Sequence, residues 1–470
     1  MYVKFGTDGA RGEYSNELMP APGIITPESA FRIGAAAVET LGLRHWVMVQ
    51  DTRTFNPELA EAMSEGIRFA DGSVIDLGIL PTPAGSMIAN HLSKISRSPY
   101  GAISLTASHN PWRHAGVKVS GANGKKLDDE LTGRIEEAAN SLSVVRRGVE
   151  YSDEQAKHAN IDALRQLYPD MLISTIDPDT DPEFLHGKKI VIDAANGAAY
   201  WSAPEVFSRL GADVIPIFVD PKGEINKGCG ATHTEEMMAT VRAMDASYGL
   251  ALDGDADRLM AFARANGQER LLDGDDAIAI ALKGLAAQNR ILVHRTAVTD
   301  YSTVGFKREM DRRGINVDFV ENGDRYVLES LEATGAHVGA EQAGHILYPH
   351  VAQRAGTLLT GDGTLAALEQ LAVEARLGQP LTEVANFDRL GYGRSDIAVA
   401  PGTDAKKIVN SESVSKVIDE AAASVNADGK VLVRGSGTEP IIRVLVKDES
   451  QNLVDEIMGR VNRAVLEAVA

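Results

Sequence analysis

The sequence predicts an α/β protein in which three similar segments are followed by a smaller α+β segment. Short apolar runs of strand length alternate with stretches that repeat apolar residues at helical spacing over most of the chain. This alternation is typical of β-α-β units. From about residue 380 the order changes to a helix, two strands around a turn, and a last helix. The length of 470 residues fits about three or four domains.

The first half of the chain alternates strand and helix signals. The expected strands lie at residues 45–49, 73–80, 101–105, 188–193, 214–219 and 248–252. The helices between them are expected at residues 57–70, from 127 to 142, and from the Asn196-Gly197 turn to Leu210. This spacing predicts strands connected by crossover helices.

The second half is expected to hold a third α/β segment and the α+β segment. Its expected strands lie at residues 290–293, 317–320, 336–338, 431–434 and 441–446, with helices at 414–425 and at the C-terminus. The weakly patterned charged stretch at 144–160 and the linker at 378–380 mark boundaries. The predicted domains are therefore 1–150, 151–258, 259–378 and 379–470.

Composition excludes several classes of protein. The net charge of −19 argues against nonspecific nucleic-acid binding, which needs a positive surface. No apolar run approaches the roughly 18 residues of a membrane span, and the N-terminus lacks the apolar core of a signal peptide. The single cysteine, Cys229, cannot form an internal disulfide, which fits a reducing cytoplasm. We expect a cytoplasmic enzyme without nucleic-acid or membrane partners.

A tight loop after the strand at 101–105 is expected to display a serine hydroxyl. It reads Thr106-Ala107-Ser108-His109-Asn110-Pro111. A serine oxygen can carry a covalent group if its surroundings stabilise the charge of that group. Ser108 is therefore a candidate nucleophile, although this stretch alone does not exclude a structural loop.

Three carboxylates at alternate positions follow the strand at 248–252. They belong to the run Asp253-Gly254-Asp255-Ala256-Asp257-Arg258. Small residues between them let the backbone fold around one hard cation. Magnesium suits the site better than calcium, because three carboxylates leave room for a phosphate oxygen and water. A solvated acidic turn is the alternative.

Two further motifs have the residues of a phosphosugar site. The run from Arg434 to Pro440, with Arg443 nearby, combines glycines, hydroxyls and guanidiniums, which suit a phosphate. The alternative is a Gly-rich hairpin turn. The loop at 339–345 contains Glu341, Gln342 and His345, which suit sugar hydroxyls, although a structural histidine is the default interpretation of His345.

Together with residues 5–12 (FGTDGARG) and 322–329 (NGDRYVLE), these motifs resemble the α-D-phosphohexomutase superfamily in order and spacing along nearly the whole chain. Within it, the chain is most similar to the bacterial phosphoglucosamine mutases. The resemblance implies four domains around a central cleft, three of similar mixed α/β topology and a smaller fourth. Five ordered motifs together are specific, whereas any one of them is not.

The resemblance also implies a role for each motif. Ser108 would be the phosphoserine that exchanges a phosphoryl group with the substrate and would contact one Mg²⁺ held by Asp253, Asp255 and Asp257. The residues expected around the reacting group are Arg11, Lys118, Arg258 and His345, with Lys118 and His345 as candidates for proton transfer. The residues expected to bind substrate are Glu341 and Ala343 at the sugar, and Arg434, Ser436, Gly437, Thr438 and Arg443 at the phosphate that does not react.

The activity implied is that of an isomerase, an intramolecular phosphotransferase that interconverts glucosamine 6-phosphate and glucosamine 1-phosphate. A sugar 1,6-bisphosphate would be the intermediate and activator, and the product would supply UDP-N-acetylglucosamine and cell-wall synthesis. The expected partner is a small phosphosugar; a homodimer is left open.

Some residues depart from the pattern of the superfamily. Ala343 stands where serine is usual, which removes a hydroxyl donor to the sugar, and His114-Ala115 replace the usual Asp-Asn. Gln342 favours glucosamine over mannose or glucose. A phosphomannomutase or phosphoglucomutase is the second hypothesis. A binding protein without activity and a hydrolase are the alternatives from other classes.

Overall fold

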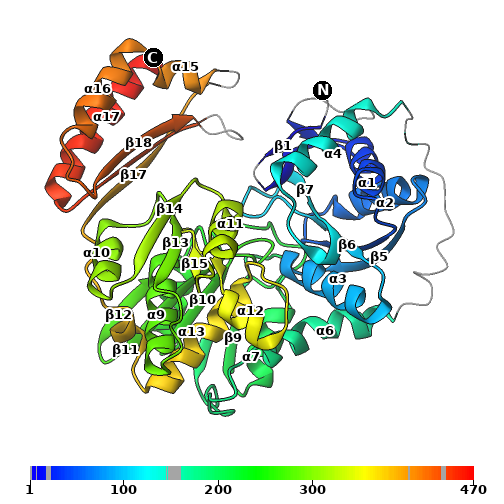
Figure 1. Ribbon diagram of the computed structural model, residues 1–470, viewed down its shortest axis with the longest axis horizontal. Coiled ribbons are helices and arrows are strands. Elements are labelled where there is room, and N and C mark those ends of the chain that lie inside the picture. Colours follow the sequence, from blue (N-terminus) through cyan, green and yellow to red (C-terminus); the bar gives the residue numbers. More distant parts are fainter. Residues whose placement is uncertain are drawn as a thin grey trace. The chain divides into compact units, whose positions relative to one another are not determined.

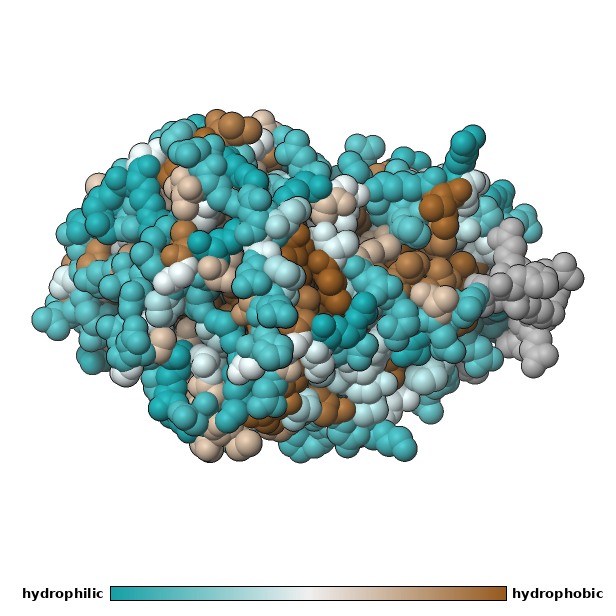
Figure 2. Space-filling model, turned by 90° about the horizontal axis from the view of Figure 1, so that it is seen from below, coloured by the Kyte–Doolittle hydropathy of each residue, from teal (hydrophilic) through white to brown (hydrophobic). Residues whose placement is uncertain are grey.

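The computed structural model describes residues 3–6, 8–16, 23–143, 146, 160–400, 403–435 and 441–469. Figure 1 shows helices and strands alternating along the chain. The chain forms two compact units, Met1–Val293 with Gly323–Ala385 and His294–Asn322 with Asn386–Ala470. Within the described ranges, no helix combines the length and apolar character needed to cross a membrane. The face drawn in Figure 2 is mostly hydrophilic, with apolar residues in smaller patches.

The first unit begins with a seven-stranded sheet of order β1-β2-β7-β6-β4-β5, in which β3 pairs with β2. Its strands are β1 (Phe5–Gly6), β2 (Gly9–Tyr14), β3 (Ile24–Ile25), β4 (His45–Gln50), β5 (Ser73–Ile79), β6 (Tyr100–Leu105) and β7 (His114–Ser120). The helices of this part are α1 (Pro27–Leu41), α2 (Asn56–Phe69), α3 (Thr82–Ser96), the 3₁₀ helix η1 (Ala122–Gly124) and α4 (Asp129–Ser141).

Strand β4 is apolar on both faces because helices cover both sides of it. Trp46 and Met48 are fully buried in one core with residues of α1, α2 and α4. Val49 points to the other face, where Gly85 of α3 leaves no room for a side chain, since a Cβ there would lie 2.9 Å from Val49 Cγ2. A strand buried on both faces reads as a continuous apolar run, which is why the sequence predicts it well.

A five-stranded sheet of order β12-β11-β10-β8-β9 follows. Its strands are β8 (Lys189–Asp193), β9 (Asp213–Ile217), β10 (Tyr248–Leu252), β11 (Leu259–Ala265) and β12 (Gln268–Leu272). The helices here are α6 (Ile161–Ser174), α7 (Ser202–Arg209) and α8 (Glu235–Ala243). Strands β9, β8 and β10 run parallel, whereas β11 returns antiparallel to β10. The loop between β10 and β11 therefore begins at the carboxyl edge of the parallel strands.

The rest of the first unit is mainly helical. It holds α9 (Gly274–Ala287), α11 (Asp324–Thr334), β15 (Gly339–Ala340), β16 (Ile346–Leu347), α12 (Pro349–Ala355), α13 (Gly363–Leu377) and α14 (Leu381–Val384). Strands β15 and β16 pair antiparallel. The five residues between them, Glu341 to His345, form a tight loop closed by a hydrogen bond from the Glu341 amide to the His345 carbonyl at 2.9 Å.

The second unit combines a parallel strand pair with an antiparallel sheet of order β17-β19-β18. Its elements are β13 (Arg295–Thr299), α10 (Val304–Arg312), β14 (Asn316–Val320), β17 (Gly391–Ala398), α15 (Ala405–Val409), α16 (Glu412–Ala422), β18 (Lys430–Gly435), β19 (Ile441–Asp448) and α17 (Gln451–Val469). Val414, Val444 and Val461 place the core of this part between the sheet and helices α16 and α17.

The predicted α/β class is confirmed, but two expected strands are wrong. Residues 290–293 form no strand, because the amides of Leu292 and Val293 donate to His337 Nε2 at 2.9 and 3.2 Å, and β13 starts only at Arg295. Residues 336–338 also lie outside a strand, and β15 follows them. The boundary expected at 144–160 falls almost entirely outside the described residues, and the four domain ranges stay a prediction.

Candidate functional site

Ser108 lies in a loop that turns sharply after β6. Its backbone is left-handed, with φ of 51°, and its side chain is fully buried. The Ser108 amide donates to Thr106 Oγ1 at 2.8 Å, and its hydroxyl donates to Asp253 Oδ2 at 2.7 Å. The serine oxygen predicted from the sequence therefore faces the first of the three predicted carboxylates, 145 positions away in the chain.

The three carboxylates form one buried cluster after β10. Asp253, Asp255 and Asp257 each offer an oxygen, and these oxygens lie within 4.8 Å of one another. Ala256, with φ of 59°, supplies the turn that directs alternate side chains to the same place. Burial, together with the neighbouring Asp257 and Asp255 carboxylates, raises the pKa of Asp253 well above its usual range.

The cluster fits a hard divalent cation. Asp255 Oδ1 and Asp257 Oδ1 are buried and have no hydrogen-bond partner, although buried carboxylate oxygens are normally paired. Oxygen ligands of this kind, close together and with remaining positions free, suit Mg²⁺. The residues present therefore fit the metal that the sequence predicts.

Lys118 connects the carboxylate cluster to the N-terminal motif. Its Nζ, on β7, lies 2.8 Å from Asp255 Oδ2, 2.7 Å from Asp257 Oδ2 and 2.9 Å from Asp8 Oδ2. Burial alone would lower the pKa of Lys118, but these three carboxylates raise it well above its usual range. Arg11 on β2 also pairs with Asp8, at 2.7 Å. Two of the predicted cations thus share one aspartate.

His345 lies between two carboxylates at the end of the loop at 341–345. Its Nδ1 is 3.7 Å from Asp257 Oδ1, and its Nε2 is 3.3 Å from Asp324 Oδ2. Burial alone would lower the pKa of His345, but Asp324 and Asp257 raise it to about 9. An imidazole held in this way is charged near neutral pH and can donate a proton.

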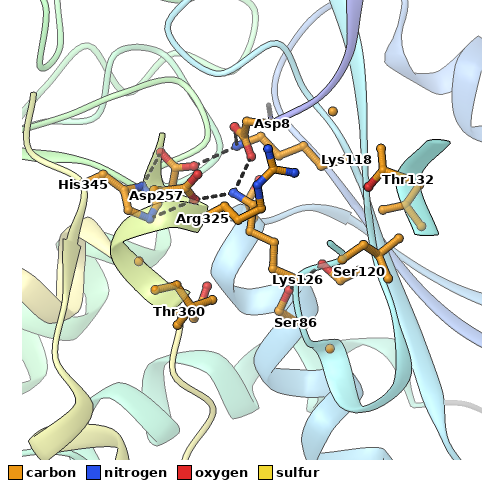
Figure 3. A pocket seen from close by; sticks show the side chains of 18 of the residues that line it. Asp8, Ser86, Lys118, Ser120, Lys126, Thr132, Asp257, Arg325, His345 and Thr360 are labelled. Atoms are coloured by element: carbon orange, nitrogen blue, oxygen red, sulfur yellow. Dashed lines mark hydrogen bonds and ion pairs between the residues drawn. The ribbon is translucent and has the colours of Figure 1, made fainter. Parts of the chain in front are cut away.

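A pocket of the first unit opens beside these groups, and Figure 3 shows Asp8, Lys118, Lys126, Asp257 and His345 pointing toward one another in it. Lys126 Nζ binds Asp8 Oδ1 at 3.0 Å and also the Asp324 carboxylate. Hydroxyl groups complete the polar part of the wall; they come from Thr82, Ser86, Ser120, Thr132 and Thr360. The part of the pocket wall near Lys118 and Lys126 is therefore charged and polar, which suits the phosphosugar expected from the sequence.

The remaining predicted residues of this unit lie around the same cluster. Arg258 Nε is 3.8 Å from Asp257 Oδ1 and 4.0 Å from Asp253 Oδ2. Glu341 is half-buried, and burial raises its pKa although the Arg258 guanidinium opposes the shift. Ala343 is exposed at the tip of the loop and contributes no polar side-chain atom.

The predicted phosphate clamp is described only in part. Arg434 on β18 and Arg443 on β19 lie opposite each other in the antiparallel register. Arg434 Nη2 donates to Tyr301 Oη at 3.2 Å, and Arg443 Nε lies 3.9 Å from Asp396 Oδ1. Ser436, Gly437 and Thr438 fall outside the described residues. Two of the five clamp residues can therefore be placed, both in the second unit.

Several contributors to the site were missed in the sequence. Thr82, at the start of α3, donates its hydroxyl to Asp255 Oδ2 at 2.7 Å, and its amide donates to the Asp255 carbonyl at 3.1 Å. No motif surrounds Thr82, so nothing in the sequence distinguishes it from an ordinary helix start. Asp8 and Asp324 do lie inside motifs that the resemblance used, and Lys126 follows Lys118 by eight positions.

Comparison with known families identifies the chain along nearly its whole length. Models described as phosphoglucomutase/phosphomannomutase alpha/beta/alpha domains I, II and III match residues 2–145, 166–267 and 273–389. The model for the C-terminal domain of the same proteins matches residues 400–464.

Individual relatives agree with this match. The phosphoglucosamine mutases of Desulforudis audaxviator and Pelotomaculum thermopropionicum are each 36% identical to the chain, over 99% of its length and 98% and 100% of theirs. Among solved structures, the Aspergillus fumigatus N-acetylphosphoglucosamine mutase in complex with GlcNAc-6P and magnesium superposes with a TM-score of 0.65 at 16% identity, over 100% of this chain and 96% of that one. At this identity, the superposition shows that the two proteins share a fold.

Proposed function

The chain belongs to the phosphoglucomutase/phosphomannomutase family, and from this premise we propose that it interconverts glucosamine 6-phosphate and glucosamine 1-phosphate. The observation that carries the chemistry is the buried Ser108 hydroxyl, 2.7 Å from a carboxylate of a three-aspartate cluster. The choice of glucosamine rests on the relatives that are 36% identical over 99% of the chain.

In the proposed reaction, Ser108 carries a phosphoryl group between turnovers. The bond between Ser108 Oγ and phosphorus breaks as a hydroxyl oxygen of the phosphosugar bonds to phosphorus, and the proton of that hydroxyl passes to a base. A sugar 1,6-bisphosphate results, turns around, and returns its other phosphoryl group to Ser108. Such a transfer needs in-line positioning and charge neutralisation more than covalent chemistry from the protein.

The carboxylates of Asp253, Asp255 and Asp257 would hold Mg²⁺. When bound, the metal offsets negative charge on the phosphoryl oxygens. Lys118, Arg11 and Arg258 are proposed to add positive charge around the same oxygens, and the charged His345 is proposed to donate a proton to the oxygen that leaves phosphorus.

Two sets of residues are proposed to recognise the substrate. Glu341 and Ala343 belong to the sugar loop, and the residues proposed to bind the phosphate that does not react are Arg434, Ser436, Gly437, Thr438 and Arg443. Water must be excluded from the phosphoserine, because hydrolysis would remove the phosphoryl group from Ser108. A cytoplasmic location and the four-domain division remain part of the proposal.

The test is a comparison of substrates with phosphorylated protein. The protein is purified, its phosphate at Ser108 is measured by mass spectrometry, and kcat/KM is determined with Mg²⁺ on glucosamine, mannose and glucose phosphates. We expect one phosphate at Ser108 and the highest kcat/KM on glucosamine phosphate. A preference for mannose or glucose phosphate would assign the chain to the second hypothesis.

A serine control distinguishes the nucleophile from general damage. Ser108→Ala is expected to abolish turnover, because it removes the hydroxyl that donates to Asp253 Oδ2 at 2.7 Å. Ser141→Ala removes an exposed hydroxyl that only donates to the Glu137 carbonyl at 2.8 Å, and it should behave as wild type. Wild-type turnover by Ser108→Ala would refute the mechanism.

A further inference from the structure

The backbone at Ser108 is held in a conformation that residues with a Cβ seldom adopt. Its φ of 51° places it in the left-handed region, where asparagine and glycine are common and serine is not. The surrounding structure must therefore impose this conformation. The direction of the Ser108 hydroxyl depends on it, since the side chain leaves from the same Cα.

Two buried side chains bind the carbonyl groups on either side of His109. Asn226 Nδ2 donates to the Ser108 carbonyl at 2.7 Å and to the Asn110 carbonyl at 3.1 Å. Arg53 Nη2 donates to the Asn110 carbonyl at 2.7 Å and lies 3.5 Å from the Ser108 carbonyl. Asn226 and Arg53 thus both bind the carbonyl oxygens of Ser108 and Asn110.

Both donors are themselves fixed. The Arg53 side chain is fully buried and pairs with the Asp51 carboxylate, so its planar guanidinium cannot swing away. Asn226 stands in the left-handed region with φ of 61°, and its amide donates to the Ala195 carbonyl at 3.0 Å. The donors are preorganised before any substrate arrives.

The loop at 253–257, which carries the three aspartates, packs against a third side of this arrangement. A Cβ at Gly254 would lie 2.7 Å from the Ser108 carbonyl oxygen and 2.8 Å from Asn226 Nδ2. The glycine between Asp253 and Asp255 therefore packs directly on the carbonyl that Asn226 holds. Any shift of that carbonyl would alter the separation between Ser108 Oγ and Asp253, now 2.7 Å.

We propose that Arg53 and Asn226 are positioning residues that clamp the Ser108 and Asn110 carbonyls and so keep the Ser108 oxygen aimed at the carboxylate cluster. Neither side chain bonds to the reacting oxygen; both act through the backbone. This inference rests on the proposed role of Ser108 as phosphoryl carrier. The clamp would keep phosphoryl transfer fast and directed to the sugar. A displaced Ser108 oxygen would react more slowly, and water would then compete for the phosphoryl group.

Asn226→Ala tests the clamp, with Asn90→Ala as the matched control. Asn90 also donates its Nδ2 to a backbone carbonyl, that of Asn123 at 3.1 Å, but on the exposed side of α3. Each protein is loaded at Ser108, and its phosphoserine is counted by mass spectrometry. Turnover per phosphoserine, KM, and the share of phosphoryl groups lost to water are then measured.

For Asn226→Ala we expect kcat per phosphoserine to fall by about tenfold or more, because a misplacement of about 1 Å lowers the rate of a reaction by about 100-fold and a smaller shift of the Ser108 oxygen costs part of that. KM should stay unchanged and the share lost to water should rise, whereas Asn90→Ala should match wild type. A purely structural role would lower the yield of folded protein without moving either quantity per phosphoserine. Wild-type values for Asn226→Ala in both measurements would overturn the proposal.

Arg53→Lys is the second variant, because it keeps the buried positive charge beside Asp51 and so protects folding. It loses the planar fork that reaches the carbonyls, and the same two changes are expected; wild-type values would again contradict the clamp. Failure of the proposed function would look different, since the wild-type protein itself would then carry no phosphate at Ser108 or convert no phosphosugar.

Discussion

At the scale of single residues, Lys118 neutralises three neighbouring carboxylates, of which Asp255 and Asp257 are buried and Asp8 is partly buried. Asp8, Asp255 and Asp257 all lie within 2.9 Å of its Nζ. Buried charges without partners are costly, and removing one member of a buried pair costs about 3–5 kcal/mol. We therefore expect Lys118 to contribute both to the proposed reaction and to the stability of the site without metal.

Replacing Lys118 tests this double role. Lys118→Met is expected to lower kcat/KM by at least about 100-fold, the effect of removing one preorganised charge. Without metal, it should also reduce the free energy of unfolding by about 3 kcal/mol, and Mg²⁺ should stabilise the variant more than the wild type. Steady-state kinetics measures kcat/KM. Urea unfolding with and without Mg²⁺ measures the loss of unfolding free energy and the stabilisation by the metal. Lys94→Met, at an exposed lysine of α3, is the control, and equal destabilisation by both variants would refute the argument.

Cys229 gives a second prediction at this scale. The thiol is fully buried, and burial together with the nearby Asp193 charge raises the pKa of Cys229 to about 12. Because the thiolate is the reactive form, we expect the native protein to react with Ellman's reagent only after denaturant is added. Rapid reaction of the folded protein would contradict the burial of Cys229 and show that the segment around this thiol opens.

At the scale of elements, the turn that starts α13 packs against His345, the proposed proton donor. A Cβ at Gly361 would lie 2.1 Å from His345 Nε2, so only glycine fits beneath the ring. Asp362 caps the helix by accepting from the Leu365 amide at 2.9 Å. The Gly363 amide donates to the Ala256 carbonyl at 2.9 Å, which connects the turn to the loop at 253–257.

Gly361→Ala should therefore displace His345 without touching the carboxylate cluster directly. A displacement of about 1 Å lowers the rate by about 100-fold, and we expect a loss of that order in kcat. The imidazole signals in NMR spectra should shift as well. Gly133→Ala, on the exposed face of α4 where nothing lies within 4 Å of the added methyl group, should leave both unchanged. Wild-type turnover by Gly361→Ala would show that the ring can move at no cost.

Elements buried on both faces could be predicted from the sequence, and elements defined by long-range bonds could not. Strand β4 reads as one apolar run. Residues 290–293 look like a strand by the same criterion, but a histidine binds their amides instead. Strand β7 was missed because Lys118 interrupts its apolar pattern.

The same division applies to the candidate site. Ser108, the aspartates and His345 lie in contiguous motifs whose order carries the resemblance. Thr82 reaches the site from 173 positions away, and Asn226 from 118 positions away. Contacts made across so many positions have no local signature, so only the fold reveals them.

At the scale of the whole molecule, an ion network around the buried Asp177 and Glu369 carboxylates joins segments of the predicted second and third domains within the first unit. Arg354 lies 3.2 Å from Asp177 Oδ2, after α6, and 3.6 Å from Glu369 Oε2 on α13. Arg290 also pairs with Asp177, at 2.7 Å, and Arg376 pairs with Glu369 at 3.2 Å. These charges fix α12 and α13, and with them the turn that seats His345.

Glu369 makes this network sensitive to acid. Burial alone would raise the pKa of Glu369, but the bond to His350 and the charges of His350, Arg376 and Arg354 lower it below its ordinary 4.5. Because the folded-state pKa is depressed, the carboxylate contributes stability above about pH 4.5, and this contribution is lost as pH falls through the folded-state pKa.

Glu369→Gln removes the charge while keeping the shape of the side chain. Near neutral pH we expect the variant to lose about 3 kcal/mol of unfolding free energy, because the Arg376 and Arg354 guanidiniums lose the charge of the buried Glu369 carboxylate. As pH falls below 4.5, protonation makes the wild-type side chain resemble glutamine, so the two unfolding free energies should converge. Urea unfolding over a pH series measures the gap, and Glu383→Gln, at an exposed glutamate, should show none. A gap that stays constant with pH would mean that the Glu369 carboxylate stabilises the fold by its shape and not by its charge.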